Sequence, residues 1–352
     1  MDATPVRHVA DHLFIVMADR DIRDVLQRPA VFSSADTFVF RRPSDPPTIA
    51  ELEGVTHRRR RASLEPLFHM YLYRSLRPSM REFLSELLDR VSMQTPPIDL
   101  IQAIVVPLST FVLGKLGGIT PEEAQKIQRY HPALPVRPER TSWQLLRPVF
   151  LAAIARRRSQ SSSHHQKDVI SLLIETCNDK EILSSLLYLL RMNEATHVLL
   201  TNVIYELLRP PRRWDQVCLF PRLIGFAIEE AARLHPPIPT LTRTCTEDTV
   251  VGGVTIPAGA CLALLLSSAN RDEWWPHPES FIFPRRERSH LSFGYGEHVC
   301  LGAPLARAEI SLVLELFCER FPGLRLAAPV HDDQRPKDGM RHAPRPLLVH
   351  LK

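Results

Sequence analysis

The sequence predicts a mainly α-helical protein with a minor β portion. Its 352 residues include 31 prolines and only 13 glycines, which favours helices interrupted by proline over an all-β fold. Hydrophobic residues make up 44% of the chain, enough to fill a sizeable core. Apolar segments of helical length end at proline pairs, and no linker of distinct composition divides them. We therefore expect a single domain over residues 1–352.

In the N-terminal half, hydrophobic periodicity predicts one short strand and several helices. The strand covers residues 13–16, and the helices cover residues 19–27, 56–68, 77–91 and 98–116. Two proline-rich segments, residues 41–47 and 132–138, should interrupt this helical region. Residues 156–166 are rich in serine and histidine and predict a polar loop.

In the C-terminal half, capping and turn signals mark the elements. Asn178 and Glu181 form a capping-box pattern at the start of a long helix that should end at residue 208, before two prolines. A second helix over residues 223–234 also ends at a proline pair. Residues 249–256 predict a hairpin turned at Gly252 and Gly253. A last helix ends at residue 321, and residues 347–351 predict a closing strand.

Charge and cysteine usage exclude several classes of protein. The net charge of +5 comes without an aromatic–basic motif, so a basic docking face for an acidic partner is favoured over nucleic-acid binding. Six scattered cysteines without CxxC pairs argue against a disulfide framework and for a reducing cytoplasm. The polar N-terminus predicts no signal peptide, and the apolar run 258–269 is too short to cross a membrane.

One cysteine lies in a glycine-rich stretch directly before an apolar helix. Residues 293–302 read FGYGEHVCLG, and the cysteine is Cys300. A thiol there faces the free N–H groups and the positive end of a helix, which both favour the metal-binding thiolate. The glycines allow close approach to a flat ligand. The pattern indicates haem held by cysteine sulfur; a lone cysteine would more simply be a buried thiol near a helix cap.

The spacing of this stretch resembles the haem-binding loop of cytochromes P450. The run CLGAPLAR at 300–307, the run ANRD at 269–272 and the run EAAR at 230–233 are also similar to that family, and the resemblance extends over nearly the whole chain. It implies the P450 fold, haem b as cofactor and Cys300 as the iron ligand. It also implies that Glu230 and Arg233 form a buried structural pair, rather than an ordinary surface pair or a catalytic one.

The resemblance further implies cationic partners for the two haem propionates. Arginine suits a carboxylate because its fork can bind both oxygens. The matching positions are His57, Arg61, Arg243 and His298, with His290 as a weaker fifth candidate. Phe293 and Gly302, on either side of Cys300, complete the predicted cofactor-binding residues.

The long central helix departs from the family's oxygen-activation motif. In that motif small residues make room for oxygen, and an acid followed by a threonine delivers protons. Here Glu194 takes the place of the acid, Ala195 that of the threonine, and Arg191 and Met192 those of the small residues. We interpret Glu194 as a proton donor rather than a satisfied buried acid, with Thr196, one position late, as a second catalytic candidate. Three explanations compete: water or a substrate hydroxyl replaces the missing hydroxyl, the chemistry uses peroxide or no oxygen, or oxidative activity is weak or lost.

The resemblance implies a haem-thiolate monooxygenase acting on a small apolar or amphipathic molecule, such as a natural-product intermediate. A ferredoxin and its reductase should supply electrons, because the chain lacks a Rossmann fingerprint and an iron–sulfur cysteine set. The expected pocket residues are Met192, Ala195, Ile238, Thr240 and Leu241. The alternatives are a peroxide-driven oxidation, a rearrangement, dehydration or coupling, and a non-catalytic partner protein. The chain is short for the family, so we expect a trimmed N-terminus and a trimmed pocket roof around residues 132–159.

Overall fold

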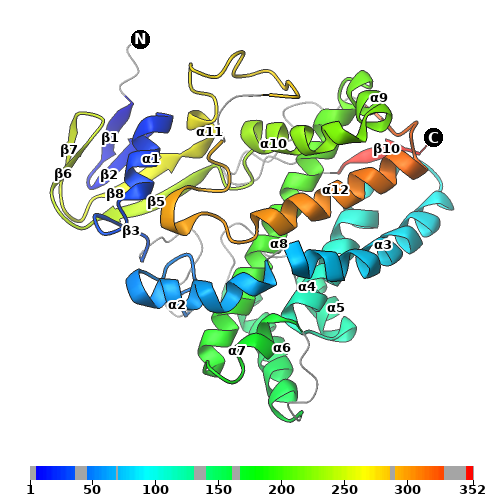
Figure 1. The fold of residues 1–352 in the computed structure, drawn as a ribbon, viewed down its shortest axis with the longest axis horizontal. Coiled ribbons are helices and arrows are strands. Elements are labelled where there is room, and N and C mark those ends of the chain that lie inside the picture. Colours follow the sequence, from blue (N-terminus) through cyan, green and yellow to red (C-terminus); the bar gives the residue numbers. More distant parts are fainter. Residues whose placement is uncertain are drawn as a thin grey trace.

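The fold was analysed in a computed structural model. It describes residues 5–35, 46–68, 70–130, 140–160, 167–285, 290–328 and 346–351. The prediction of a mainly helical protein is confirmed (Figure 1). The helices are α1 (Asp19–Gln27), α2 (Gly54–Leu64), α3 (Met70–Ser92), α4 (Val106–Gly117), α5 (Pro121–Tyr130), α6 (Arg140–Arg158), α7 (Val169–Leu173), α8 (Asp179–Leu208), α9 (Arg212–Leu219), α10 (Ile224–Leu234), α11 (Leu266–Ala269) and α12 (Ala303–Arg320). Within the described ranges, no helix is long and apolar enough to span a membrane.

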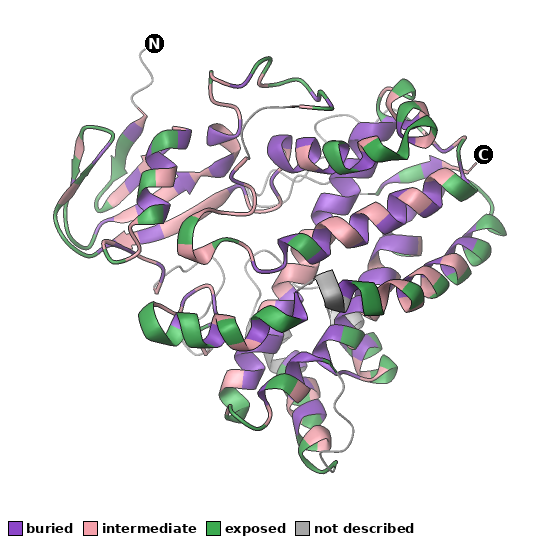
Figure 2. Ribbon diagram, viewed as in Figure 1, coloured by how far each residue is buried: buried purple, intermediate pink, exposed green. Residues whose placement is uncertain are grey.

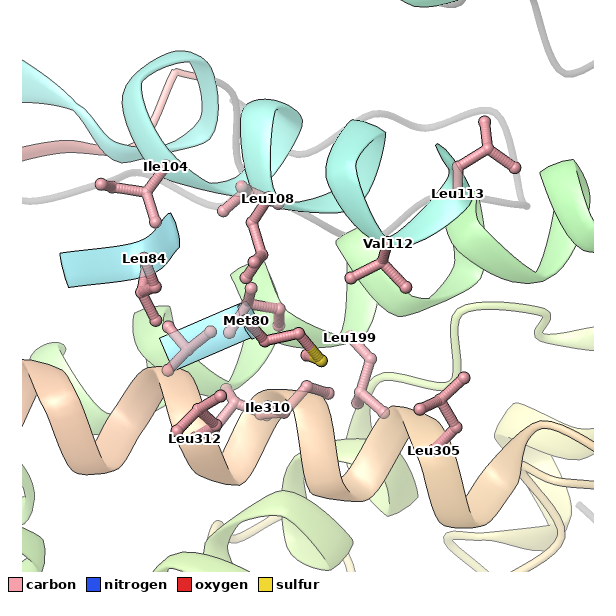
Figure 3. Packing of buried hydrophobic residues seen from close by; sticks show 14 of the residues in the cluster. Met80, Leu84, Ile104, Leu108, Val112, Leu113, Leu199, Leu305, Ile310 and Leu312 are labelled. Carbon is pink, nitrogen blue, oxygen red and sulfur yellow. The ribbon is translucent and has the colours of Figure 1, made fainter. Parts of the chain in front are cut away.

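The long helix α8 organises the helical layer. It begins with the predicted capping box, in which the Asn178 side chain accepts from the Glu181 N–H and the Glu181 side chain accepts from the Asn178 N–H. Its 30 residues extend about 45 Å at 1.5 Å per residue. It packs on α4, α10 and α12. Figure 3 shows Leu108 and Val112 of α4 and Leu305 of α12 in the shared core.

The strands form three small sheets at the edges of this layer. A five-stranded sheet has the order β1–β2–β8–β5–β3, in which β2 and β8 are parallel. The other two sheets have the order β4–β10–β9 and β6–β7. The strands are β1 (Val6–Ala10), β2 (Leu13–Val16), β3 (Phe32–Ser33), β4 (Ile98–Asp99), β5 (Thr240–Cys245), β6 (Thr249–Val251), β7 (Val254–Ile256), β8 (Cys261–Leu265), β9 (Arg325–Leu326) and β10 (Leu348–His350).

Most predicted elements are confirmed, and two need correction. The segment 98–116 is not one helix, because β4 pairs with β10 and a π-helical turn at Ile101–Val105 precedes α4. The segment 156–166 is not a loop throughout, because α6 continues to Arg158, whose guanidinium binds Asp179. The predicted proline-rich segment at 132–138 and most of the one at 41–47 lie outside the described residues, as do residues 161–166.

Burial along α8 indicates where a ligand could bind. Residues 182–190 and 198–208 are almost all buried, but residues 191–197 between them are all only partly buried. In Figure 2 this stretch is the pink part of α8, behind the start of α12. A half-exposed stretch in the centre of a central helix means that a cavity lies beside it.

Candidate active site

The glycine-rich loop before α12 holds Cys300 in a fixed backbone conformation. The Cys300 N–H donates to the Phe293 carbonyl at 2.8 Å, and the Gly294 N–H donates to the Leu291 carbonyl at 2.8 Å. Gly296 has a φ of 73°, and a Cβ there would lie 2.4 Å from the carbonyl oxygen of Leu26 in α1. Since backbone cannot move aside, only glycine fits this turn.

The end of α10 supports the start of the same loop. Asn270 donates to the Arg233 carbonyl at 3.1 Å and to the Ser292 hydroxyl at 2.8 Å, and it accepts from the Leu291 N–H at 2.8 Å. The Ser292 hydroxyl donates to the Ala232 carbonyl at 2.6 Å. Asn270 is fully buried. The ANRD run therefore connects the EAAR helix to the cysteine loop.

Glu230 and Arg233 form a buried ion pair at the end of α10. Both Glu230 oxygens accept from Arg233 at 2.9 Å, and the two side chains are 2% and 1% exposed. Arg233 also donates to three backbone carbonyls, and Arg285 adds a second guanidinium 2.8 Å from both oxygens of Glu230. This geometry places the pair in a structural network away from the pocket. Arg285 was not anticipated, because no local pattern links it to Glu230.

Two opposing effects act on the Cys300 thiol. Burial raises its pKa, while the backbone N–H groups of Gly302 and Ala303 at the start of α12 lower it. The sequence predicted the second effect, but burial is the larger, so the pKa of the thiol is raised in the protein without metal. A bound cation reverses this balance, because metal coordination deprotonates a thiol outright.

Four basic side chains gather beside the loop: two come from α2, one from β5 and one from the cysteine loop itself. Rings of His57 and His298 lie 4.2 Å apart, and Arg61 donates to the Val299 carbonyl at 2.9 Å. Burial lowers the pKa of Arg243 to about 10, and burial together with His57, Arg243 and Arg61 lowers the pKa of His298 to about 3. Arg243 is 7% exposed and has no ion pair within 4.0 Å among the described residues, although Glu53 acts on it at longer range; Glu297 lies 3.1 Å from His57. We call these four residues the cation cluster; it fits a ligand that brings negative charge.

His290, the weaker fifth candidate for a propionate contact, lies outside the cation cluster. Its Nε2 is 3.3 Å from Glu229, which also accepts two hydrogen bonds from Arg307 at 2.6 and 2.8 Å. Burial raises the pKa of Glu229, but Arg307 and His290 outweigh it and hold that pKa at about 2. The Arg307 guanidinium stacks over the Phe293 ring at 4.2 Å. The structure thus places His290 in a support for the loop, outside the cation cluster.

A mostly apolar cavity of about 250 Å³ lies between α8 and the loop. Most of the residues proposed from the sequence line it: Met192, Glu194, Ala195, Thr196, Ile238, Leu241, Phe293, His298, Cys300 and Gly302. Thr240 is absent from this lining, because successive side chains of a strand point to opposite faces and its neighbour Leu241 faces the cavity. Sequence reasoning missed Thr48, Tyr188 and Leu266, which also line it.

The polar residues of the central α8 turn are held in different ways. The Thr196 hydroxyl donates to the Met192 carbonyl at 3.1 Å within the helix. Asn193 donates to the Ser109 carbonyl at 2.8 Å and accepts from the Ser109 hydroxyl, which ties α8 to α4. The Met192 methyl group occupies the space beside Gly302, 2.2 Å from where a Cβ would lie. Methionine is flexible enough to leave this position, so the cleft beside it is adjustable.

Comparisons with known proteins agree with this fold and site. A family model described as Cytochrome P450 matches residues 223–344. The steroid C26-monooxygenase of Mycobacterium tuberculosis (strain CDC 1551 / Oshkosh) is 30% identical over 326 residues, covering 87% of this chain and 86% of that protein. The erythromycin C-12 hydroxylase of Saccharopolyspora erythraea is 31% identical over 356 residues, covering 94% and 88%. A solved structure of a mutant of P450 EryK in complex with erythromycin B has a TM-score of 0.84 and 28% identity over 99% of this chain and 93% of that chain.

Fold and site together define a haem-thiolate protein. The chain belongs to the cytochrome P450 family, whose cofactor is haem b. The residues present fit that group: a thiol faces a mostly apolar cavity, and buried Arg243 forms no ion pair within 4.0 Å among the described residues. Cys300 would hold the iron, and the cation cluster would hold the propionates.

Proposed function

We propose that this protein is a haem-thiolate monooxygenase that oxidises a small, largely apolar molecule, within a single domain over residues 1–352. The observation that carries this proposal is the cavity in which Cys300, Ala195 and Glu194 face the same space. Bound haem b with thiolate ligation supplies oxygen activation. The relatives named above are a steroid C26-monooxygenase and an erythromycin C-12 hydroxylase, which supports the oxidation of a small organic molecule.

The chain's own residues would then bind, orient and supply protons. The apolar wall excludes water and orients the substrate against the cysteine side of the cavity. Glu194, 15% exposed and at the cavity wall, is our candidate for passing on the proton that the reaction consumes. Thr196 is less suited, because its hydroxyl already donates within α8.

A separate ferredoxin with its reductase would supply electrons. Helix α2 carries a row of arginines, and the side chain of Arg58 is 63% exposed on the same helix that contributes His57 and Arg61 to the cation cluster. An exposed basic face next to the cofactor site suits an acidic donor, whose approach would weaken as salt concentration rises.

The first experiment measures the absorption spectrum of the reduced protein with carbon monoxide. We expect the red-shifted Soret band of thiolate ligation in the wild type and its loss in Cys300→Ser. The matched control is Cys177→Ser, a free cysteine just before α8 and outside the cavity lining. Full activity of the Cys300→Ser variant would contradict the proposal.

A second candidate function is peroxide-driven oxidation, which the absence of a hydroxyl at Ala195 favours. Turnover with a ferredoxin system and NAD(P)H should be compared with turnover on peroxide alone. If Ala195→Thr speeds the dioxygen-dependent reaction, the native site lacks a useful hydroxyl. No turnover with either oxidant, together with co-purification of another enzyme, would instead indicate a non-catalytic partner role.

A further inference from the structure

One face of α8 brings polar groups into a mostly apolar cavity. Tyr188, Arg191 and Glu194 follow one another at intervals of three residues, which places them on one side of the helix. Across from them the lining is apolar, with Ile238 and Leu241 among its members. A guanidinium is an unusual group in such a wall, because burying a charge without full hydrogen bonding is costly.

The Arg191 guanidinium is incompletely satisfied. Its side chain is 18% exposed, and its Nη1 lies 3.6 Å from a Glu194 oxygen, longer than an N–H···O hydrogen bond. Its Nε is buried and has no hydrogen-bond acceptor within the described part of the chain. Arginine carries five N–H donors, and the buried Nε donor at least is left without an acceptor.

Resting on the proposed function, we propose that Arg191 anchors the carboxylate of an amphipathic substrate whose apolar body fills the rest of the cavity. A carboxylate matches the arginine fork with two parallel hydrogen bonds. Glu194, three residues along the same helix, holds the guanidinium toward one side and balances its charge before the substrate binds. At 3.6 Å the Arg191–Glu194 contact is longer than a hydrogen bond, so guanidinium donors are left for a second carboxylate.

This anchor is separate from the cation cluster. The cluster residues come from α2, β5 and the cysteine loop, whereas Arg191 comes from the middle of α8. The two haem propionates would balance the charge of the cluster, which leaves Arg191 for the substrate. The anchor therefore predicts a preference among substrates and no change in haem content when it is removed.

The test measures equilibrium binding to the haem-loaded protein by calorimetry. The probes are two carboxylates with different apolar bodies, one a decanoyl chain and the other an adamantyl cage. Each carboxylate is compared with its own methyl ester and primary amide. We expect the carboxylate to bind at least about tenfold more tightly than the ester on one body or both. Arg191→Gln should reduce that ratio to within about twofold and leave the ester affinity unchanged, while Arg191→Lys should keep part of the preference. The matched control is Arg90→Gln, an exposed arginine of α3.

Three outcomes would overturn the anchor: no carboxylate preference in the wild type on either body, an unchanged preference in Arg191→Gln, or loss of haem in that variant, which would make Arg191 a propionate partner. Haem content and the carbon monoxide spectrum are recorded on the same samples. A normal thiolate band without carboxylate preference refutes the anchor alone. An Arg191-dependent preference in a protein without that band supports the anchor and refutes the proposed function.

Discussion

Replacing Glu230 by glutamine should be among the most destabilising single changes in this chain. The carboxylate accepts from Arg233 at 2.9 Å through both oxygens, from Arg285 at 2.8 Å and from the Ile282 N–H at 2.8 Å. Glutamine keeps one acceptor and turns an NH₂ donor toward two guanidinium groups. The variant thus leaves buried cations uncompensated, which costs about 3–5 kcal/mol in the free energy of unfolding.

The assay is urea unfolding of the haem-loaded protein, followed by far-ultraviolet circular dichroism. The matched control is Glu86→Gln, because Glu86 pairs with Arg90 at 3.9 Å on the surface of α3, with side chains about 60% exposed. The control should lose less than about 0.5 kcal/mol. If the two variants unfold with free energies within about 1 kcal/mol of each other, the buried pair does not stabilise the fold as argued.

Three further predictions concern the loop, the cation cluster and a buried acid. Gly296→Ala should lower the free energy of unfolding more than Gly253→Ala, as measured by urea unfolding. Both glycines have positive φ, but only a Cβ at position 296 would contact backbone atoms. Arg243→Gln should release haem to an acceptor protein at least about tenfold faster than wild type, since it removes a buried cation; an unchanged rate would exclude a propionate contact. Burial raises the pKa of Glu309 from 4.5 to about 7, so the stability that its protonated form contributes is present below pH 4.5 and lost as pH rises to about 7. In the wild type, the free energy of unfolding should fall by roughly 3 kcal/mol across that pH range, and Glu309→Gln should largely remove this fall. A variant with the same pH profile as the wild type would contradict the role of Glu309.

Features with local causes could be predicted from the sequence. The capping box at Asn178 and the hairpin at Gly252 and Gly253 depend on residues within a few positions of each other, and both are present. The pocket face of α8 follows from helical periodicity once the cysteine loop is recognised. Met192 and Ala195 therefore lie in the cavity wall as expected.

Features with distant causes could not be predicted in this way. β2 pairs with β8 about 250 residues later, and no periodicity within either strand specifies the partner. Asn270 belongs to a recognisable run, but its role depends on Arg233 and Ser292 meeting it in space. The direction of the Cys300 pKa also depends on burial, which the helix start alone does not reveal.

Helix α1 packs against the cysteine loop. Its Leu26 carbonyl lies against Gly296, the Gln27 side chain donates to the Tyr295 hydroxyl at 3.2 Å, and the Arg23 guanidinium stacks on the Tyr295 ring at 4.8 Å. Since α1 supplies none of the described residues that line the cavity, substitutions on its inner face would alter the loop that carries Cys300 and leave the cavity wall unchanged.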